Sequence, residues 1–207
     1  MDIELWVDPV CPWCWVTARW LVDEVAAARD LRITWRPFSL LVKNATPTDS
    51  PYFAALERSY GLLRVMEAVR AGDGERALQR LYLAYGTRIH HRRDTFFDVG
   101  DALADAGLDR AYADALTDER WDGPLLRQHH DGLALVGDDV GTPILAVPGD
   151  DGARFGIYGP IITRVPDTEA ALRLWDGVVA CVSTEGFWEL KRTRTVRPDP
   201  GPEPVSA

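Results

Sequence analysis

The chain has 207 residues, enough for one domain with an insertion or for two small domains, and an apolar fraction of 46% with eight Trp supplies a sizeable core. A net charge of −9 argues against nucleic-acid and anionic-membrane partners, and we expect neither. Acidic residues directly follow Met1, and no positively charged segment precedes an apolar run. We therefore expect no secretory signal and a cytoplasmic location, where a persistent structural disulfide is disfavoured.

The first strong pattern is a strand followed by a helix, with two cysteines between them. Residues 3–7 are short and apolar enough for a buried strand, and the Asp8-Pro9-Val10 segment does not easily continue one. From Trp15 to Val25 apolar residues recur at helical spacing. The C-x-x-C motif of Cys11, Pro12, Trp13 and Cys14 therefore falls where a strand hands over to a helix.

This position has chemical consequences for the cysteine pair. The first turn of a helix leaves backbone N–H groups unpaired and carries the positive end of the helix dipole, which favours a thiolate. Cys11 is predicted at or just before the helix start, with Pro12 at the first helical position, where its missing N–H costs nothing. Cys14 follows inside the first turn and faces the sheet. We expect an exposed nucleophile and a covered resolving thiol.

A zinc site is the main alternative for a C-x-x-C motif, and it would need two more Cys or His ligands. The chain offers His90, His91, His129 and His130, but none lies in a partner motif with metal-ligand spacing. We therefore expect redox chemistry and no metal. Cys181 lies within a helical apolar pattern, and we expect an inert buried thiol there.

The rest of the chain predicts an α/β fold whose strands are separated in the sequence by a long helical segment. Residues 31–38 alternate as a second strand, which implies a parallel βαβ unit, and the loop 39–48 carries Asn44 near the strand edge where ligands bind in such sheets. From about residue 50 to 136 the pattern is helical, and a segment of about a hundred residues before the next strand is too long for a loop. We predict a folded helical insertion.

The C-terminal part returns to strands and a helix. Pro143 immediately precedes an apolar strand, which fits either an ordinary edge start or a cis-proline loop that faces the cysteines. A hairpin through 148–152 and a helix over 168–182 follow, and the proline-rich end reads as a loose tail. The cationic segment 191–197 is predicted to be a solvated charged tail, with attraction of an acidic ligand or a partner subunit as the alternative.

Several blocks along nearly the whole chain resemble a known family. The blocks are Asp8-Pro9-Val10-Cys11-Pro12-Trp13-Cys14-Trp15, Arg88-Ile89-His90, His129-His130-Asp131-Gly132, Asp139-Val140-Gly141-Thr142-Pro143, Gly159-Pro160 and Glu189-Leu190-Lys191-Arg192-Thr193-Arg194-Thr195. The chain resembles thioredoxin-fold proteins of the DsbA class, and more closely the actinobacterial mycothiol-dependent nitroreductases.

The resemblance implies an α/β thioredoxin-like fold formed by residues 1–48 and 138–195, an inserted all-helical domain over 49–137 and a loose tail over 196–207. It implies an oxidoreductase that draws electrons from mycothiol, a low-molecular-weight thiol, and reduces nitro-aromatic or related small acceptors. Cys11 would be the nucleophile that carries the mixed disulfide, and Cys14 would resolve it. Thr142 and Pro143 match the cis-proline loop that aligns the bound thiol.

The remaining candidate residues and functions stay open. Trp13 could stack on an aromatic acceptor. Asn44 is either a ligand contact or a solvated loop residue, and His90 lies either near the site or on the surface. Of His129 and His130, which point to different faces, we expect one in the core and one in solvent. A DsbA-like protein disulfide oxidoreductase and a redox-responsive binding module are the alternative functions, and a homodimer stays open. Isomerases of this fold generally carry serine at the nucleophile position, so the cysteine pair argues against isomerisation.

Overall fold

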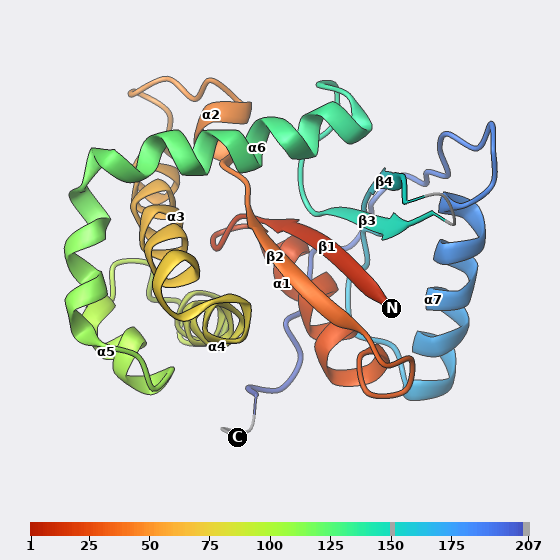
Figure 1. Cartoon of the computed structure of the whole chain (residues 1–207), viewed down its shortest axis with the longest axis horizontal. Coiled ribbons are helices and arrows are strands. Elements are labelled where there is room, and N and C mark those ends of the chain that lie inside the picture. The colour runs from red at the N-terminus through yellow and green to blue at the C-terminus, as the bar shows by residue number, and fades with distance from the viewer. Residues whose placement is uncertain (150–151, 205–207) are drawn as a thin grey trace.

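The computed structural model describes residues 1–149 and 152–204 (Figure 1). Its described strands form one sheet in the order β2-β1-β3-β4. The strands are β1 Asp2–Val7, β2 Arg32–Pro37, β3 Ile144–Pro148 and β4 Arg154–Tyr158. β1 and β2 are parallel, whereas β3 pairs antiparallel with both β1 and β4. The predicted parallel unit and the predicted pairing of the hairpin strands are confirmed, and residues 150–151 of the hairpin turn lie outside the described residues.

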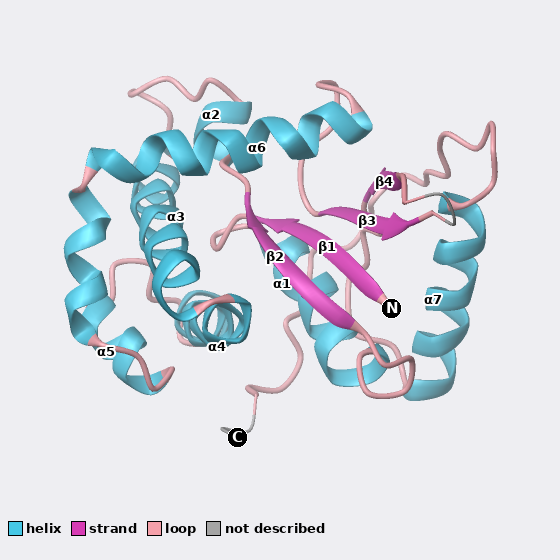
Figure 2. Ribbon diagram, viewed as in Figure 1, coloured by secondary structure: helices cyan, strands magenta, loops and turns pink. Residues whose placement is uncertain are grey.

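Helices account for most of the remaining chain (Figure 2). The α-helices are α1 Pro12–Arg19, α2 Leu40–Lys43, α3 Phe53–Asp73, α4 Glu75–Gly86, α5 Val99–Asp105, α6 Asp122–Val136 and α7 Thr168–Val182. α1 continues into a π-helical segment, Trp20–Val25, and α4 into another, Thr87–His91. Short 3₁₀ helices at Arg110–Thr117 and Glu119–Trp121 connect α5 to α6. The predicted loop 39–48 contains a helical turn, α2, because the Ser39 hydroxyl accepts a hydrogen bond from the Val42 N–H at 3.2 Å and caps it.

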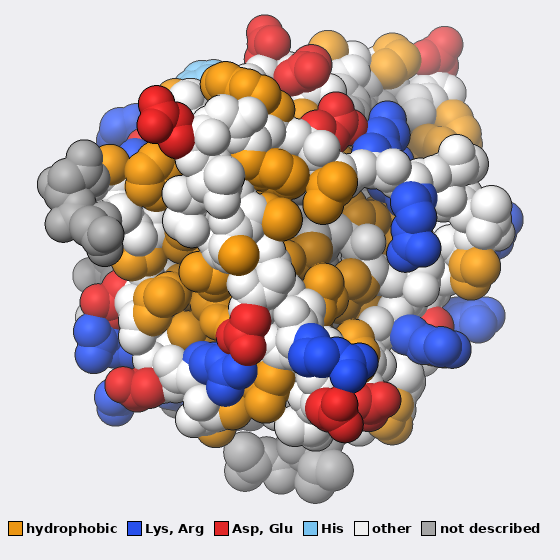
Figure 3. Space-filling view, turned by 90° about the vertical axis from the view of Figure 1, so that its right-hand side faces the viewer, with side chains coloured by type: hydrophobic (Ala, Val, Ile, Leu, Met, Phe, Trp, Pro, Cys, Tyr) orange, Lys and Arg blue, Asp and Glu red, His pale blue; other side chains and the backbone are white. Residues whose placement is uncertain are grey.

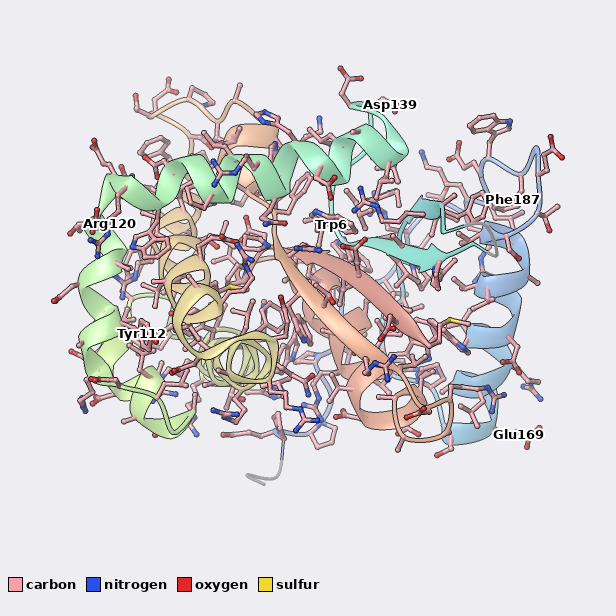
Figure 4. The ribbon with its side chains drawn as sticks, viewed as in Figure 1. Trp6, Tyr112, Arg120, Asp139, Glu169 and Phe187 are labelled. Carbon is pink, nitrogen blue, oxygen red and sulfur yellow. The ribbon has the colours of Figure 1, made fainter. Side chains whose placement is uncertain are left out.

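The two faces of the sheet bury different side chains, as the alternation of a strand requires. Leu5 and Val7 of β1 belong to the large core that includes residues of α1, α3, α4 and α7, whereas Trp6 packs with Phe38 and Ile144 on the opposite face. α6 covers Trp6, whose indole N–H donates to the Gln128 carbonyl at 2.8 Å (Figure 4). A methyl group on Gly132 would lie 2.8 Å from the Trp6 ring, so glycine allows this close approach of helix and strand.

The helical segment lies beside β2, and α7 lies at the opposite side of the sheet, near β4 (Figure 1). The Trp35 backbone N–H of β2 donates to a Glu75 carboxylate oxygen at 3.1 Å, which ties the sheet to α4. α4 also meets α1, because a methyl group on Gly86 would overlap the Trp15 ring at 2.0 Å. These two contacts hold the start of α1 between the sheet and the helical segment.

The C-terminal end differs from the loose tail that the sequence predicts. Described residues from 196 to 204 have no helix or strand, yet the Asp199 N–H donates to the Thr163 carbonyl at 2.7 Å and Glu203 pairs with Arg92 at 2.7 Å. The segment is therefore held against the body of the protein at two points. In the described part of the chain, no helix combines the length and the apolar character that crossing a bilayer requires.

Candidate active site

Cys11 is the N-cap of α1, and Pro12 is the first residue of the helix, as predicted. The Cys11 backbone is extended, and its N–H donates to the Asp8 carbonyl at 3.0 Å, so a tight turn links β1 to the helix. The Cys11 carbonyl in turn accepts from the Trp15 N–H at 3.1 Å. The Cys11 sulfur consequently lies at the positive end of α1, where unpaired N–H groups favour an anion.

Cys14 and the loop before β3 face each other beneath this helix start. The Cys14 sulfur lies 3.3 Å from the Thr142 hydroxyl oxygen, and the Cys11 thiol donates to the Thr142 carbonyl at 3.7 Å. The Thr142–Pro143 peptide bond is cis, as the sharper of the two sequence interpretations predicted. Burial, with a further contribution from neighbouring Cys11, raises the pKa of the Cys14 thiol well above its usual value. Cys14 is therefore a thiol in the reduced protein at neutral pH.

The Thr142 hydroxyl has one hydrogen to donate but contacts two groups, the Trp6 carbonyl and the Cys14 sulfur. It donates to the Trp6 carbonyl at 2.7 Å, so its oxygen accepts the hydrogen of the Cys14 thiol. If Cys14 becomes a thiolate, the hydroxyl is placed to turn its hydrogen toward the sulfur. Thr142 thus links β1, the proline loop and the covered cysteine.

Cys11 is less exposed than the sequence suggests: 4% of its surface is accessible, against 0% for Cys14. The accessible part opens into a cavity of about 530 Å³. The cavity is lined by Val10, Cys11, Pro12, Trp13, Leu40, Asn44, Thr46, Pro47, Ser50, Tyr52, Ala55 and Leu56. None of these residues carries a charged side chain, and the volume falls in the range typical of small-molecule sites. A reagent that enters this cavity reaches Cys11 before Cys14.

The predicted ligand residues divide between this cavity and a second one. Trp13 and Asn44 line the large cavity, and Asn44 forms the C-cap of α2. His90 lies on the other side of Pro12, in a cavity of about 210 Å³ that it shares with Trp15. Its ring stacks on Trp15 at 5.6 Å, and its Nε2–H donates to the Pro9 carbonyl at 2.9 Å. Burial lowers the pKa of His90 to about 4, so the ring is neutral above that pH.

Asp8 is a candidate functional residue to which the sequence analysis assigned no role in the site. Its carboxylate is fully buried and accepts from the Leu40 N–H at 2.8 Å, the Val10 N–H at 3.1 Å and the Ser59 hydroxyl. These donors come from the C-x-x-C loop, α2 and α3, so one side chain joins the redox loop to the helical segment. Burial raises the pKa of Asp8 to about 6. An acidic residue three positions before Cys11 was the signal that could have found it.

His91 accepts from the indole N–H of Trp15, the residue after Cys14, at 3.2 Å, whereas His129, His130 and Cys181 belong to other parts of the structure. His129 is buried in contact with Phe38 and accepts from the Ser39 N–H at 3.3 Å, whereas His130 is exposed, as predicted. Cys181 is half-buried rather than buried. Among the described residues, no group of three or more His, Cys, Asp or Glu side chains is arranged to hold a metal ion.

The cationic segment 191–197 contacts the site, which the prediction of a solvated tail did not anticipate. The Arg194 guanidinium carbon lies 5.3 Å from the centre of the Trp13 ring, within cation–π range. Trp13 itself is uncharged and lines the large cavity, and Arg194 contacts its ring without being one of the residues that line the cavity.

A strand-to-helix C-x-x-C motif beside a cis-proline loop, in a sheet with an inserted helical segment, defines a thiol oxidoreductase with a DsbA-like thioredoxin fold. Residues 10–192 match the Rv2466c-like family, described as mycothiol-dependent nitroreductase Rv2466c, and the chain belongs to this family. The uncharacterized protein Rv2286c of Mycobacterium tuberculosis is 27% identical over 93% of this chain and 82% of its own length.

Solved structures show the same fold at low sequence identity. The cytosolic disulfide reductase DsbM from Pseudomonas aeruginosa has a TM-score of 0.57 and 15% identity, covering 87% of this chain and 99% of its own. A probable DsbA oxidoreductase, SCO1869 from Streptomyces coelicolor, has a TM-score of 0.56 and 16% identity and covers both chains fully, at 100% each. These similarities confirm the predicted α/β fold class.

Proposed function

We propose that this protein uses Cys11 and Cys14 and the thiol mycothiol to reduce small molecules such as nitro-aromatic compounds. The observation that carries the proposal is the position of Cys11 at the edge of an uncharged cavity of about 530 Å³. This cavity suits a small apolar acceptor better than a charged or extended one. The family name supports mycothiol as the electron-donating co-substrate.

The proposed chemistry is a two-electron cycle. The reduced pair gives two electrons and two protons to the acceptor and becomes the Cys11–Cys14 disulfide; a nitro group that takes them up becomes a nitroso group and water. A mycothiol thiolate then attacks the Cys11 sulfur, forming a mixed disulfide and releasing Cys14 as a thiol. A second mycothiol attacks the mycothiol sulfur, frees Cys11 and leaves as mycothiol disulfide.

Each residue has a role that follows from its place in the site. Cys11, the accessible sulfur, is the nucleophile and carries the mixed disulfide, and Cys14 resolves that disulfide when the reaction runs in reverse. Thr142 and Pro143 align the bound thiol beside Cys11. Trp13 offers a ring face to an aromatic acceptor, and Asn44 a polar contact at the cavity wall. His90 lines the smaller cavity, and its hydrogen bond to the Pro9 carbonyl supports the C-x-x-C loop.

The first experiment is the reduction of the oxidised protein by mycothiol and by glutathione at equal concentration, followed by Trp fluorescence. Trp13 lies between the two cysteines and Trp15 directly follows Cys14, so their fluorescence should report on the state of the pair. Faster reduction by mycothiol supports the proposal, and equal rates or no reduction contradict the co-substrate assignment. Cys11→Ser is expected to abolish turnover of a nitro-aromatic acceptor, whereas Cys181→Ser, a matched change at a half-buried thiol outside the site, leaves it intact.

A protein disulfide oxidoreductase is the alternative that the same cysteine geometry serves. Faster turnover of a reduced, unfolded polypeptide than of any small thiol would favour it.

Cytoplasmic location and a homodimer remain parts of the proposal. For the homodimer, Trp188 and Leu190 are highly exposed, at 88% and 79%, on the segment after α7. The face that carries α7 shows hydrophobic side chains near its centre (Figure 3). Sedimentation of the full chain tests this part.

A further inference from the structure

The segment from Arg194 to Glu203, which we call the strap, lies against residues at the start of α1. At one end Arg194 lies on Trp13, and at the other Glu203 pairs with Arg92. Between them Pro198 and Pro200 line the smaller cavity with Pro12 and His90, and the Asp199 N–H bonds to the Thr163 carbonyl. Arg194 itself is exposed, and its guanidinium lies over the Trp13 ring.

Arg194 is the cation held against a wall of a cavity that has no charged lining. Trp13 lines the cavity, and Arg194 contacts its ring at 5.3 Å. Within the described residues, Arg194 has neither a hydrogen bond nor an ion pair, so its N–H groups are available to a ligand. The cation also sits in a protein of net charge −9, which otherwise repels anions overall.

We propose that Arg194 is a specificity-determining residue that makes the Trp13 cavity prefer acceptors carrying an anionic substituent, such as an aromatic carboxylate, over neutral acceptors of the same size. An aromatic ring bound near Trp13 would place a carboxylate at the rim, where the planar guanidinium offers paired donors. The inference rests on the proposed function for its relevance to catalysis. It concerns binding alone, however, and can be tested without turnover.

The test is calorimetric titration of the full chain, kept oxidised so that it cannot reduce the ligands, with 4-nitrobenzoate and with 4-nitrobenzamide. These ligands match in size and differ in one charge. Arg194→Gln is expected to weaken 4-nitrobenzoate binding by about fivefold, the effect of one partly exposed ion pair, and to leave 4-nitrobenzamide within about twofold. Arg194→Lys is expected to recover part of the preference, and added salt to weaken only the benzoate.

Arg192→Gln is the matched control, because it removes the same charge two residues away, at a position that is also exposed but does not stack on Trp13. The inference is overturned if Arg194→Gln changes both ligands equally or neither, if Arg192→Gln has the same effect, or if neither ligand binds the unaltered protein. A charge preference without any nitro-aromatic turnover would instead contradict the proposed function and leave this inference standing.

Discussion

The Cys14 sulfur lies 3.3 Å from the Thr142 hydroxyl, although 128 residues separate them in the chain. This contact joins the loop before β3 to the covered cysteine. The Thr142 hydroxyl donates to the Trp6 carbonyl while Cys14 is a thiol, and it is placed to donate to the Cys14 sulfur once that thiol loses its proton.

Replacing Thr142 by Val should therefore slow the step in which Cys14 attacks a mixed disulfide at Cys11. One lost hydrogen bond is worth about 1 kcal/mol, or about a fivefold lower rate. The step can be followed with Ellman's reagent, whose second thiolate is released when Cys14 resolves the mixed disulfide. Thr142→Ser retains the hydroxyl and should keep the rate. A Val variant as fast as the Ser variant would show that the hydroxyl has no part in this step.

The contribution of Asp8 to the free energy of unfolding should fall as the pH rises. Burial raises its folded-state pKa from 3.8 to about 6, so the native state binds the proton more tightly than the unfolded chain. The stabilisation is complete below pH 4 and is lost as the pH passes about 6, with an upper bound of about 3 kcal/mol. Urea unfolding of the protein and of Asp8→Asn between pH 4 and 7.5 measures it. The difference between the two should change with pH across this window, and parallel curves would contradict the assignment.

The contribution of His129 to the free energy of unfolding should change with pH in the opposite direction. Burial lowers its pKa from 6.5 to about 4, so the unfolded chain binds the proton more readily and stability falls as the pH drops through that range. His129→Asn keeps an acceptor for the Ser39 N–H without a titrating ring. The variant should lose this part of the pH dependence in the same unfolding series. His130→Asn, at an exposed neighbour, is the control and should leave it unchanged.

Gly86→Ala should loosen the packing of α4 against α1. The added methyl group would lie 2.0 Å from the Trp15 ring, which is itself buried and stacked on His90. Overpacking of this kind costs about 1–3 kcal/mol. Gly177→Ala in α7, where nothing lies within 4 Å, should instead stabilise by about 0.5–1 kcal/mol. Thermal unfolding of both variants separates the steric effect from the loss of a glycine.

Local sequence signals determined the backbone of the site. The apolar run of β1, the proline after Cys11 and the helical spacing beyond Cys14 predict the strand, the N-cap and α1, and the structure confirms each of them. These features depend on residues within a few positions of one another, so the sequence carries them directly. The parallel pairing of β1 with β2 follows in the same way from the length of the crossover.

Tertiary structure alone decided which side chains meet the cysteines. Asp8 becomes a buried hub only when α2 and α3 bring Leu40 and Ser59 to it, and burial then shifts its pKa. Arg194, in a segment that reads as a solvated tail, reaches Trp13 because the C-terminal strap is anchored elsewhere. Such contacts join positions far apart in the chain, and no periodicity or capping pattern encodes them. The physical reason is that burial and electrostatic neighbours are properties of the packed chain.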